Sequence, residues 1–170
     1  MERRNDPTRL SLPSDLEIVV TRDFDASPAA LFQAWTEPAR VRRWVPCPTM
    51  TMPVCEIDLR EGGPWRWVLR DPATGVDHPL SGHYTDVARP DRLVFTRRHE
   101  SFPGSDHVVT VSFVERGGVT TVSQVFLHPS KQSRDGHLAS GMEVGLEETW
   151  LRLADLVGAS ASASAARANP

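Results

Sequence analysis

The side chains best suited to acid–base chemistry in this chain are its six histidines. None of them forms an HExxH or HxxxH pair or a cluster with cysteine, so the sequence predicts no metal centre. A GxSxG nucleophile motif, a phosphate-binding P-loop and a GxGxxG dinucleotide motif are also absent. No catalytic residue and no cofactor is therefore predicted, and the sequence favours a non-catalytic protein over an enzyme.

Three polar side chains are candidates for contact with a ligand because strand alternation groups them with apolar residues. Arg97 and His99 fall on the same face of a predicted strand as Phe95, and His107 begins another alternating strand. If these faces line a cavity, a buried arginine or histidine needs a partner, which a ligand carboxylate or phenolate would supply. Alternatively, the three side chains lie at strand ends and reach water.

Aromatic and aliphatic residues would complete such a lining. Trp65 and Trp67 share one face of a strand, and Met142, Leu146 and Trp150 share one stripe of a helix. These side chains either fill the core themselves or surround a ligand. The predicted ligand-binding residues are Trp65, Trp67, Phe95, Arg97, His99, His107, Met142, Leu146 and Trp150.

The element expected to position these residues is a long amphipathic helix over residues 135–157. Its apolar side chains fall within an arc of about 120° when successive residues are spaced by 100°. Gly158 is its predicted C-cap. Gly141 and Gly145 each cost roughly 0.5–1 kcal/mol relative to alanine inside a helix, so they indicate either close helix–sheet packing or the close approach of a ligand.

The rest of the chain is predicted to form two short helices and a series of strands. Residues 16–24 form a predicted strand, and two short helices begin at Pro28 and Pro38. Six further strands are predicted over residues 51–60, 65–70, 76–87, 92–100, 107–115 and 119–127. Successive tight turns predict an α+β fold with a curved seven-stranded antiparallel sheet wrapped round the long C-terminal helix. The two short helices would plug one end of the cavity between them.

Length and charge limit the classes of protein. The 170 residues indicate a flexible lead over 1–14, a single domain over 15–158 and a disordered Ala/Ser tail over 159–170. A net charge of −3 provides no electrostatic reason to bind nucleic acid. No secretory signal and no apolar run long enough to span a membrane is found. The two cysteines, Cys47 and Cys55, are expected to be reduced thiols in a cytoplasmic protein.

An ordered set of short motifs runs through nearly the whole predicted domain. They are RDF at 22–24, SPAALFQAWTEP at 27–38, Trp44, EIDLREGG at 56–63, GHY at 82–84, PDRLVFT at 90–96 and SGME at 140–143. In this order they resemble the SRPBCC (START/birch-pollen-allergen-like) superfamily, and more narrowly bacterial proteins related to the C-terminal domain of the activator of the heat-shock-protein-90 ATPase. The resemblance implies a helix-grip fold. One departure is Val45-Pro46-Cys47-Pro48, where relatives have a Gly-Pro turn, and it is expected to reshape the mouth of the cavity.

The resemblance also implies a function, namely the binding of a small hydrophobic or aromatic molecule between the sheet and the C-terminal helix. Two alternatives remain open. One is a cyclase/aromatase-like enzyme in which Arg97, His99 or His107 orients a substrate and transfers a proton. The other is an interaction module like the chaperone-ATPase activator. A homodimer through Val144 and Leu151, on the outer face of the helix, is a further hypothesis.

Overall fold

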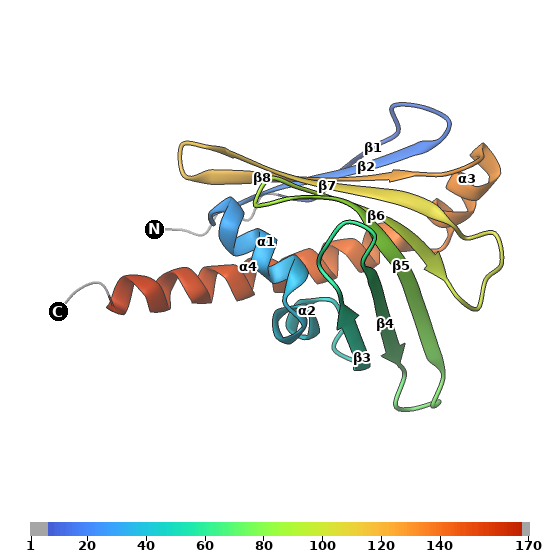
Figure 1. The fold of residues 1–170 in the computed structure, drawn as a ribbon, viewed down its shortest axis with the longest axis horizontal. Helices are drawn as coiled ribbons and strands as arrows, with labels where there is room; N and C mark the ends of the chain where they lie inside the picture. The colour runs from blue at the N-terminus through green and yellow to red at the C-terminus, as the bar shows by residue number, and fades with distance from the viewer. Residues whose placement is uncertain (1–6, 168–170) are drawn as a thin grey trace.

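A strongly curved antiparallel sheet forms the body of the protein. The long C-terminal helix and the two short helices after the first long strand lie in its concave side (Figure 1). The computed structural model describes residues 7–167. Its strands are β1 (Arg9–Ser11), β2 (Glu17–Phe24), β3 (Thr51–Ile57), β4 (Pro64–Arg70), β5 (Asp77–Ala88), β6 (Arg92–His99), β7 (His107–Arg116) and β8 (Val119–Leu127). The helices are α1 (Pro28–Thr36), α2 (Pro38–Trp44), α3 (Lys131–Ala139) and α4 (Met142–Arg167). The predicted α+β helix-grip architecture is therefore confirmed.

The order of strands across the sheet is β1-β2-β8-β7-β6-β5-β4-β3, and every neighbouring pair is antiparallel. Hairpin connections account for the run from β3 to β8. Strand β2 pairs with β8, which places the first long strand beside the last strand of the meander, while β3 lies at the opposite edge of the sheet. The described part of the sheet has eight strands instead of the predicted seven. The additional strand, β1, pairs Leu10 with Val20 at the edge of the sheet. Three residues between two prolines are too few to show an alternating pattern, so this strand was missed within the predicted flexible lead.

The predicted single helix over residues 135–157 is two helices. Ser130 caps α3, because its hydroxyl accepts a hydrogen bond of 3.1 Å from the backbone N–H of Ser133. The chain then breaks at Gly141, whose φ of +80° is a left-handed conformation that glycine adopts without steric cost. The glycine that was read as a helix-interior position therefore separates α3 from α4.

The far end of α4 also differs from the prediction. The helix does not stop at Gly158 but continues to Arg167. Alanine has the highest helix propensity, and five of the residues from 159 to 167 are alanine, so this stretch extends the helix instead of forming a disordered tail. Figure 1 shows these last turns running beyond the sheet. Residues 168–170 of the predicted tail lie outside the described residues.

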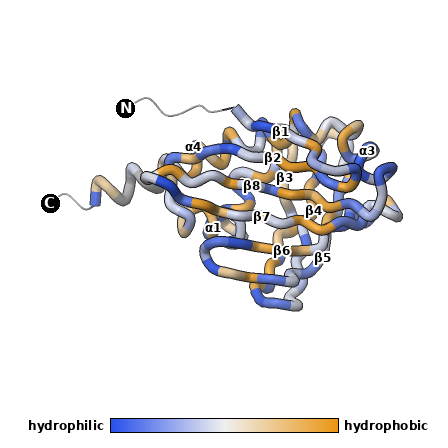
Figure 2. The backbone as a smooth tube through the Cα atoms, turned by 90° about the horizontal axis from the view of Figure 1, so that it is seen from above, coloured by the Kyte–Doolittle hydropathy of each residue, from blue (hydrophilic) through white to orange (hydrophobic). Residues whose placement is uncertain are grey.

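The core lies between the concave face of the sheet and α1 and α4. Trp150 and Leu153 of α4 are fully buried, and so are Val109 and Val111 of β7. The ring of Trp150 lies 6.0 Å from that of Phe24. Figure 2 shows hydrophobic residues concentrated along the strands and hydrophilic residues towards the turns. Within the described residues, no helix is long and apolar enough to cross a membrane.

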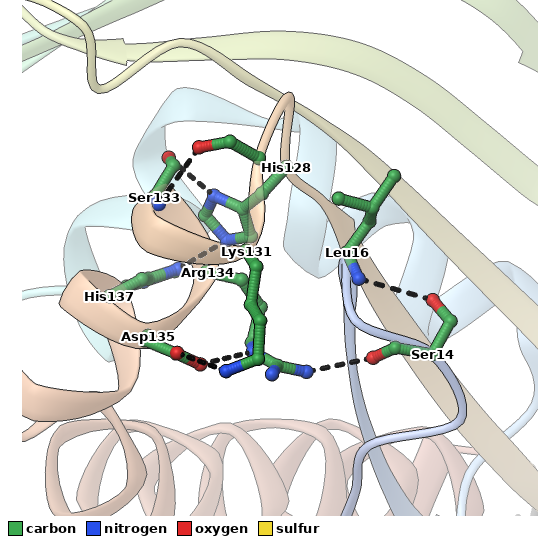
Figure 3. A network of polar contacts seen from close by, with 9 residues as sticks. Ser14, Leu16, His128, Lys131, Ser133, Arg134, Asp135 and His137 are labelled. Carbon is green, nitrogen blue, oxygen red and sulfur yellow. Dashed lines mark hydrogen bonds and ion pairs between the residues drawn. The ribbon is translucent and has the colours of Figure 1, made fainter.

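The segment before β2 is attached to both C-terminal helices. The backbone N–H of Thr8 donates to Oε2 of Glu147 in α4 at 3.3 Å. Nη1 of Arg134 in α3 donates to the backbone oxygen of Ser14 at 2.7 Å (Figure 3). Polar contacts thus connect the N-terminal segment of the described chain with α3 and with the first turns of α4.

Candidate ligand-binding cavity

A cavity of about 350 Å³ lies between the inner face of the sheet and α4. Strands β4, β5, β6 and β8 supply one side, and α4 supplies the other. The tryptophans of α1 and α2 close one end. The lining residues are Trp35, Trp44, Val45, Cys47, Met50, Trp65, Trp67, Leu69, Leu80, Phe95, Arg97, Gln124, Phe126, His137, Ser140, Met142, Gly145, Leu146, Thr149 and Trp150.

Aromatic rings in contact with one another form the sheet side of this cavity. The ring of Trp65 lies 4.9 Å from that of Trp67 and 5.6 Å from that of Phe95. All three project to the inner face because they occupy matching positions of two alternating strands. Their edge-to-face and tilted arrangement is the geometry that aromatic pairs prefer.

Gly82 determines how Trp65 is held. A Cβ atom at Gly82 would lie 1.8 Å from the backbone oxygen of Thr96 and 2.9 Å from Nε1 of Trp65. The space left by the missing side chain lets the Trp65 indole donate a hydrogen bond of 3.1 Å to that oxygen. The residue after Thr96 is Arg97, so the same contact fixes the part of β6 that carries the arginine.

The opposite end of the cavity is closed by the helical tryptophans. The ring of Trp35 lies 4.6 Å from Trp44 and 6.1 Å from Trp150. The indole of Trp44 donates to the backbone oxygen of Ala34 at 2.8 Å. Cys47 follows in the loop after α2 and also lines the cavity, so the departure at residues 45–48 lies where the resemblance led us to expect it to act.

Three polar atoms of the lining are buried without a hydrogen-bond partner among the described residues. They are the indole Nε1 atoms of Trp67 and Trp150 and Oε1 of Gln124. Trp65 and Trp44, in contrast, both donate to backbone oxygens. Because buried donors and acceptors are almost always paired, these three atoms mark the places where a bound molecule could complete the hydrogen bonding.

Arg97 is the one charged residue that lines the cavity. Burial lowers the pKa of its guanidinium to about 10, which still leaves it protonated at neutral pH. Its side chain is half-buried and has no hydrogen bond or ion pair with any described residue. The lining contains no aspartate or glutamate, so the cavity holds an uncompensated positive charge.

Three histidine rings from separate elements pack together beside this arginine. His107 stacks on His128 with ring centroids 4.7 Å apart, and His137 of α3 lies 5.2 Å from His107. Nε2 of His128 and Nδ1 of His137 are joined by a hydrogen bond of 3.0 Å, and Nδ1 of His128 contacts Oγ of Ser133 at 3.2 Å (Figure 3). Of the three, His137 lines the cavity.

The histidine cluster is neutral at physiological pH. Burial, and then the positive charge of Arg97, lower the pKa of His107 to about 4 and that of His137 to about 3. Burial also lowers the pKa of His128. Nδ1 of His107 contacts the backbone oxygen of Ser105 at 2.8 Å and must carry the proton, because a carbonyl only accepts.

This cluster predicts a loss of stability in mild acid. The histidine pKa values are lower in the folded state than the ordinary value of about 6.5, so the unfolded chain binds more protons as the pH falls. The free energy of unfolding should be at its full value above about pH 6.5 and should decrease by about 4 kcal/mol between pH 7 and pH 5, with about 2 kcal/mol from each of His107 and His137. Urea denaturation at several pH values measures this. In His137→Gln the decrease should be about 2 kcal/mol smaller, and an equal dependence of the free energy of unfolding on pH in the two proteins would contradict the assignment.

The structure brings together seven of the nine predicted ligand-binding residues. Trp65, Trp67, Phe95, Arg97, Met142, Leu146 and Trp150 all line the cavity. His107 lies outside the lining but contacts Phe126 and His137, which belong to it. His99 lies apart, at the end of β6, where its ring is 4.5 Å from that of Phe102.

Several lining residues were not predicted. Gln124 had a visible signal, since strand alternation sets it on the same face as Val122 and Phe126 in an otherwise apolar series. Trp35 and Trp44 were assigned to helices that plug the cavity without being named as lining. His137 had no signal, because its position depends on where α3 begins and ends.

A larger, open depression of about 980 Å³ on the sheet has a different character. Its side chains include Arg66 and Arg98, which alternate with the inward-facing residues of β4 and β6 and so lie on the opposite face. Arg66 is paired with Glu100 at 2.9 Å and Arg98 with Asp106 at 2.8 Å. Trp65 and Arg97 line this depression as well as the cavity, so the unpaired arginine faces both spaces. The aromatic and aliphatic lining under the sheet makes the cavity the better candidate site for a largely apolar ligand.

The described residues contain no group of three or more His, Cys, Asp or Glu side chains arranged to hold a metal ion. His107 and His128 contact each other through their ring faces, and ring nitrogens of His128 and His137 are hydrogen bonded to each other, whereas metal ligands direct their nitrogen lone pairs to a common point. The histidine cluster is therefore a packed group of neutral imidazoles.

A curved antiparallel sheet closed round a C-terminal helix, with two short helices after its first long strand, defines a helix-grip protein of the SRPBCC type. The chain belongs to the family described as activator of Hsp90 ATPase homolog 1-like protein, whose family model matches residues 25–158. The resemblance found in the sequence is thereby confirmed.

Solved structures with this fold come from several bacteria. A crystal structure of a Rhodobacter sphaeroides protein is 25% identical, with a TM-score of 0.86 over 91% of this chain and 99% of that one. Protein Ms6760 from Mycobacterium smegmatis is 22% identical, with a TM-score of 0.77 and the same coverage of both chains. An AHSA1-like protein from Aeromonas hydrophila is 19% identical, with a TM-score of 0.65 over 84% of this chain and 94% of that one. Among curated proteins, none matches this chain significantly.

Proposed function

We propose that this protein binds a small, largely hydrophobic or aromatic molecule in the cavity between the sheet and α4. The observation that carries the proposal is the lining itself, in which tryptophan, phenylalanine and aliphatic side chains surround about 350 Å³ with a few polar atoms among them. Ligand sites commonly have a volume of roughly 300–1,000 Å³ and this mixture of lining. The volume suits a ligand of one or two fused rings better than a long lipid.

Van der Waals contacts and side-chain entropy both favour binding of a ligand in the cavity. Side chains that face a void lose contacts on one side, because no atoms lie at van der Waals distance there. Trp67 and Leu146 stand on opposite walls, so a flat apolar molecule between them would restore such contacts to both. The aromatic rings have few rotatable bonds, so little conformational entropy would be lost when they close on a ligand.

A second candidate function is catalysis of the cyclase/aromatase kind. One observation favours it: His137 lines the cavity and is hydrogen bonded to His128, which in turn contacts the Ser133 hydroxyl. A neutral imidazole in this position can accept a proton from a bound molecule and pass it along the pair. In this proposal His137, and not His99, carries the acid–base role.

Fluorescence of the neutral probe N-phenyl-1-naphthylamine tests the binding proposal. The wild-type protein should bind it saturably, with one site per chain. Leu146→Trp places a larger side chain in the cavity and should weaken binding about tenfold or more. Val144→Trp is the matched control, since Val144 lies two residues away on α4 with 67% of its surface exposed. Absence of saturable binding, or equal affinities for all three proteins, would overturn the proposal.

A further inference from the structure

We propose that the ligand is an aromatic anion, with a carboxylate or phenolate oxygen bound by the guanidinium of Arg97 and its ring between the tryptophans. This inference rests on the proposed binding function and adds the chemical class of the ligand. Two observations support it. They are the set of unpaired hydrogen-bond donors and acceptors in the cavity lining and the unpaired charge of Arg97.

The lining of the cavity has more unpaired hydrogen-bond donors than unpaired acceptors. Arg97 has five N–H donors and no acceptor, and no described residue pairs with its side chain. The indole N–H groups of Trp67 and Trp150 are buried and unpaired as well. A single unpaired acceptor, Oε1 of Gln124, stands against these donors. A molecule that satisfies the cavity must therefore supply acceptor oxygens, and an ionised carboxylate supplies acceptors alone.

The charges near Arg97 lead to the same class of ligand. Burial, and to a smaller extent the charge of Arg97, lower the pKa of three titratable groups, His99 of β6, His107 of β7 and His137 of α3, and all three are neutral at physiological pH. The ion pairs of neighbouring strand residues, such as Arg98 with Asp106, lie on the other face of the sheet. Among the described residues, no carboxylate forms an ion pair with Arg97. Three of the four carboxylates in the open depression that Arg97 also lines are paired with other arginines.

Arg97 would also act as a filter between anionic and neutral molecules. A carboxylate can accept two parallel hydrogen bonds from a guanidinium, and such charge-assisted bonds are stronger than neutral ones. A neutral ligand of equal shape occupies the same space but leaves the half-buried cation without a counter-charge. The rings provide affinity, whereas the arginine provides discrimination.

Displacement of N-phenyl-1-naphthylamine by 2-naphthoate and by 2-naphthamide tests this inference, because the two molecules have nearly the same shape and differ in charge. The wild-type protein should prefer the naphthoate about 10- to 100-fold. Arg97→Gln should reduce the preference to about twofold or less, and Arg97→Lys should retain part of it because the charge is kept. Arg98→Gln, on the other face, should leave the preference unchanged.

The outcomes separate this inference from the function on which it rests. If the probe binds saturably but naphthoate and naphthamide displace it equally, the anion inference is wrong and the binding function stands. The same conclusion applies if the preference survives in Arg97→Gln. If neither the probe nor either naphthalene binds the wild-type protein, the binding function itself fails.

Discussion

Replacement of Gly82 by alanine should lower the free energy of unfolding by about 3 kcal/mol or more. The new Cβ would lie 1.8 Å from the backbone oxygen of Thr96, where two bonded strands leave no room for movement of a flexible group. Either β5 and β6 separate or the Thr96 peptide turns away. In both cases the hydrogen bond from the Trp65 indole is lost, and Trp65 loses its fixed position on the cavity wall. Urea denaturation followed by tryptophan fluorescence measures both consequences.

Gly136→Ala is the matched control for this substitution. Gly136 lies inside α3, and a Cβ atom built there meets nothing within 4 Å. Alanine should therefore stabilise the protein by about 0.5–1 kcal/mol through its higher helix propensity. If Gly82→Ala unfolded at the same urea concentration as the wild type, the close approach of Thr96 would not be a feature of the protein in solution.

Replacement of Arg97 by methionine should have the opposite effect and raise the free energy of unfolding of the unliganded protein by about 1–3 kcal/mol. The arginine is half-buried without a hydrogen bond or ion pair, and burial already lowers the pKa of its guanidinium to about 10. Methionine has a similar length, is flexible and carries no charge, so it fills the same space without a desolvation penalty. A residue that lowers stability and is oriented into a cavity is the pattern expected of a functional group.

Thermal unfolding of the ligand-free protein measures the effect of Arg97→Met. The control is Arg98→Met, one residue along the same strand, where the arginine is exposed and paired with Asp106. Exposed ion pairs contribute little, so this change should alter stability by less than about 1 kcal/mol. A lower melting temperature for Arg97→Met than for the wild type would show that Arg97 has a stabilising partner.

The fold could be predicted from the sequence because its elements carry strong local signals. Alternation with period two, interrupted by glycine and proline turns, defined the strands from β3 to β8 to within a few residues. Ser27 followed by Pro28 identified the start of α1. The predictions were wrong where one residue type is compatible with two local backbone conformations. Gly141 is compatible with a helix interior and with a left-handed turn, and the sequence does not state which backbone angle the fold requires.

The candidate site was predictable where it depends on which face of an element a residue occupies. Trp65, Phe95 and Arg97 were assigned to the cavity by alternation, and the structure has them there. His99 follows the same alternation, but β6 extends past the cavity before His99 is reached. Its distance along the strand, which depends on the length and curvature of the sheet, is not encoded in a periodic pattern. The pairing of His128 with His137 depends on how α3 packs across the end of β8, which is tertiary information.

The contact between Arg134 and Ser14 has a consequence for motion on slow timescales. Arg134 holds α3 to the segment before β2, and α3 carries the cavity residue His137. Local opening in proteins occurs in cooperative units, so elements joined in this way should exchange their amide hydrogens together. The amides of α3 and of β1 would then become accessible to deuterium in one step, while those of β7 and β8 stay protected. Such an opening would carry His137 out of the cavity lining together with the segment around Ser14, which lies more than a hundred residues away along the chain.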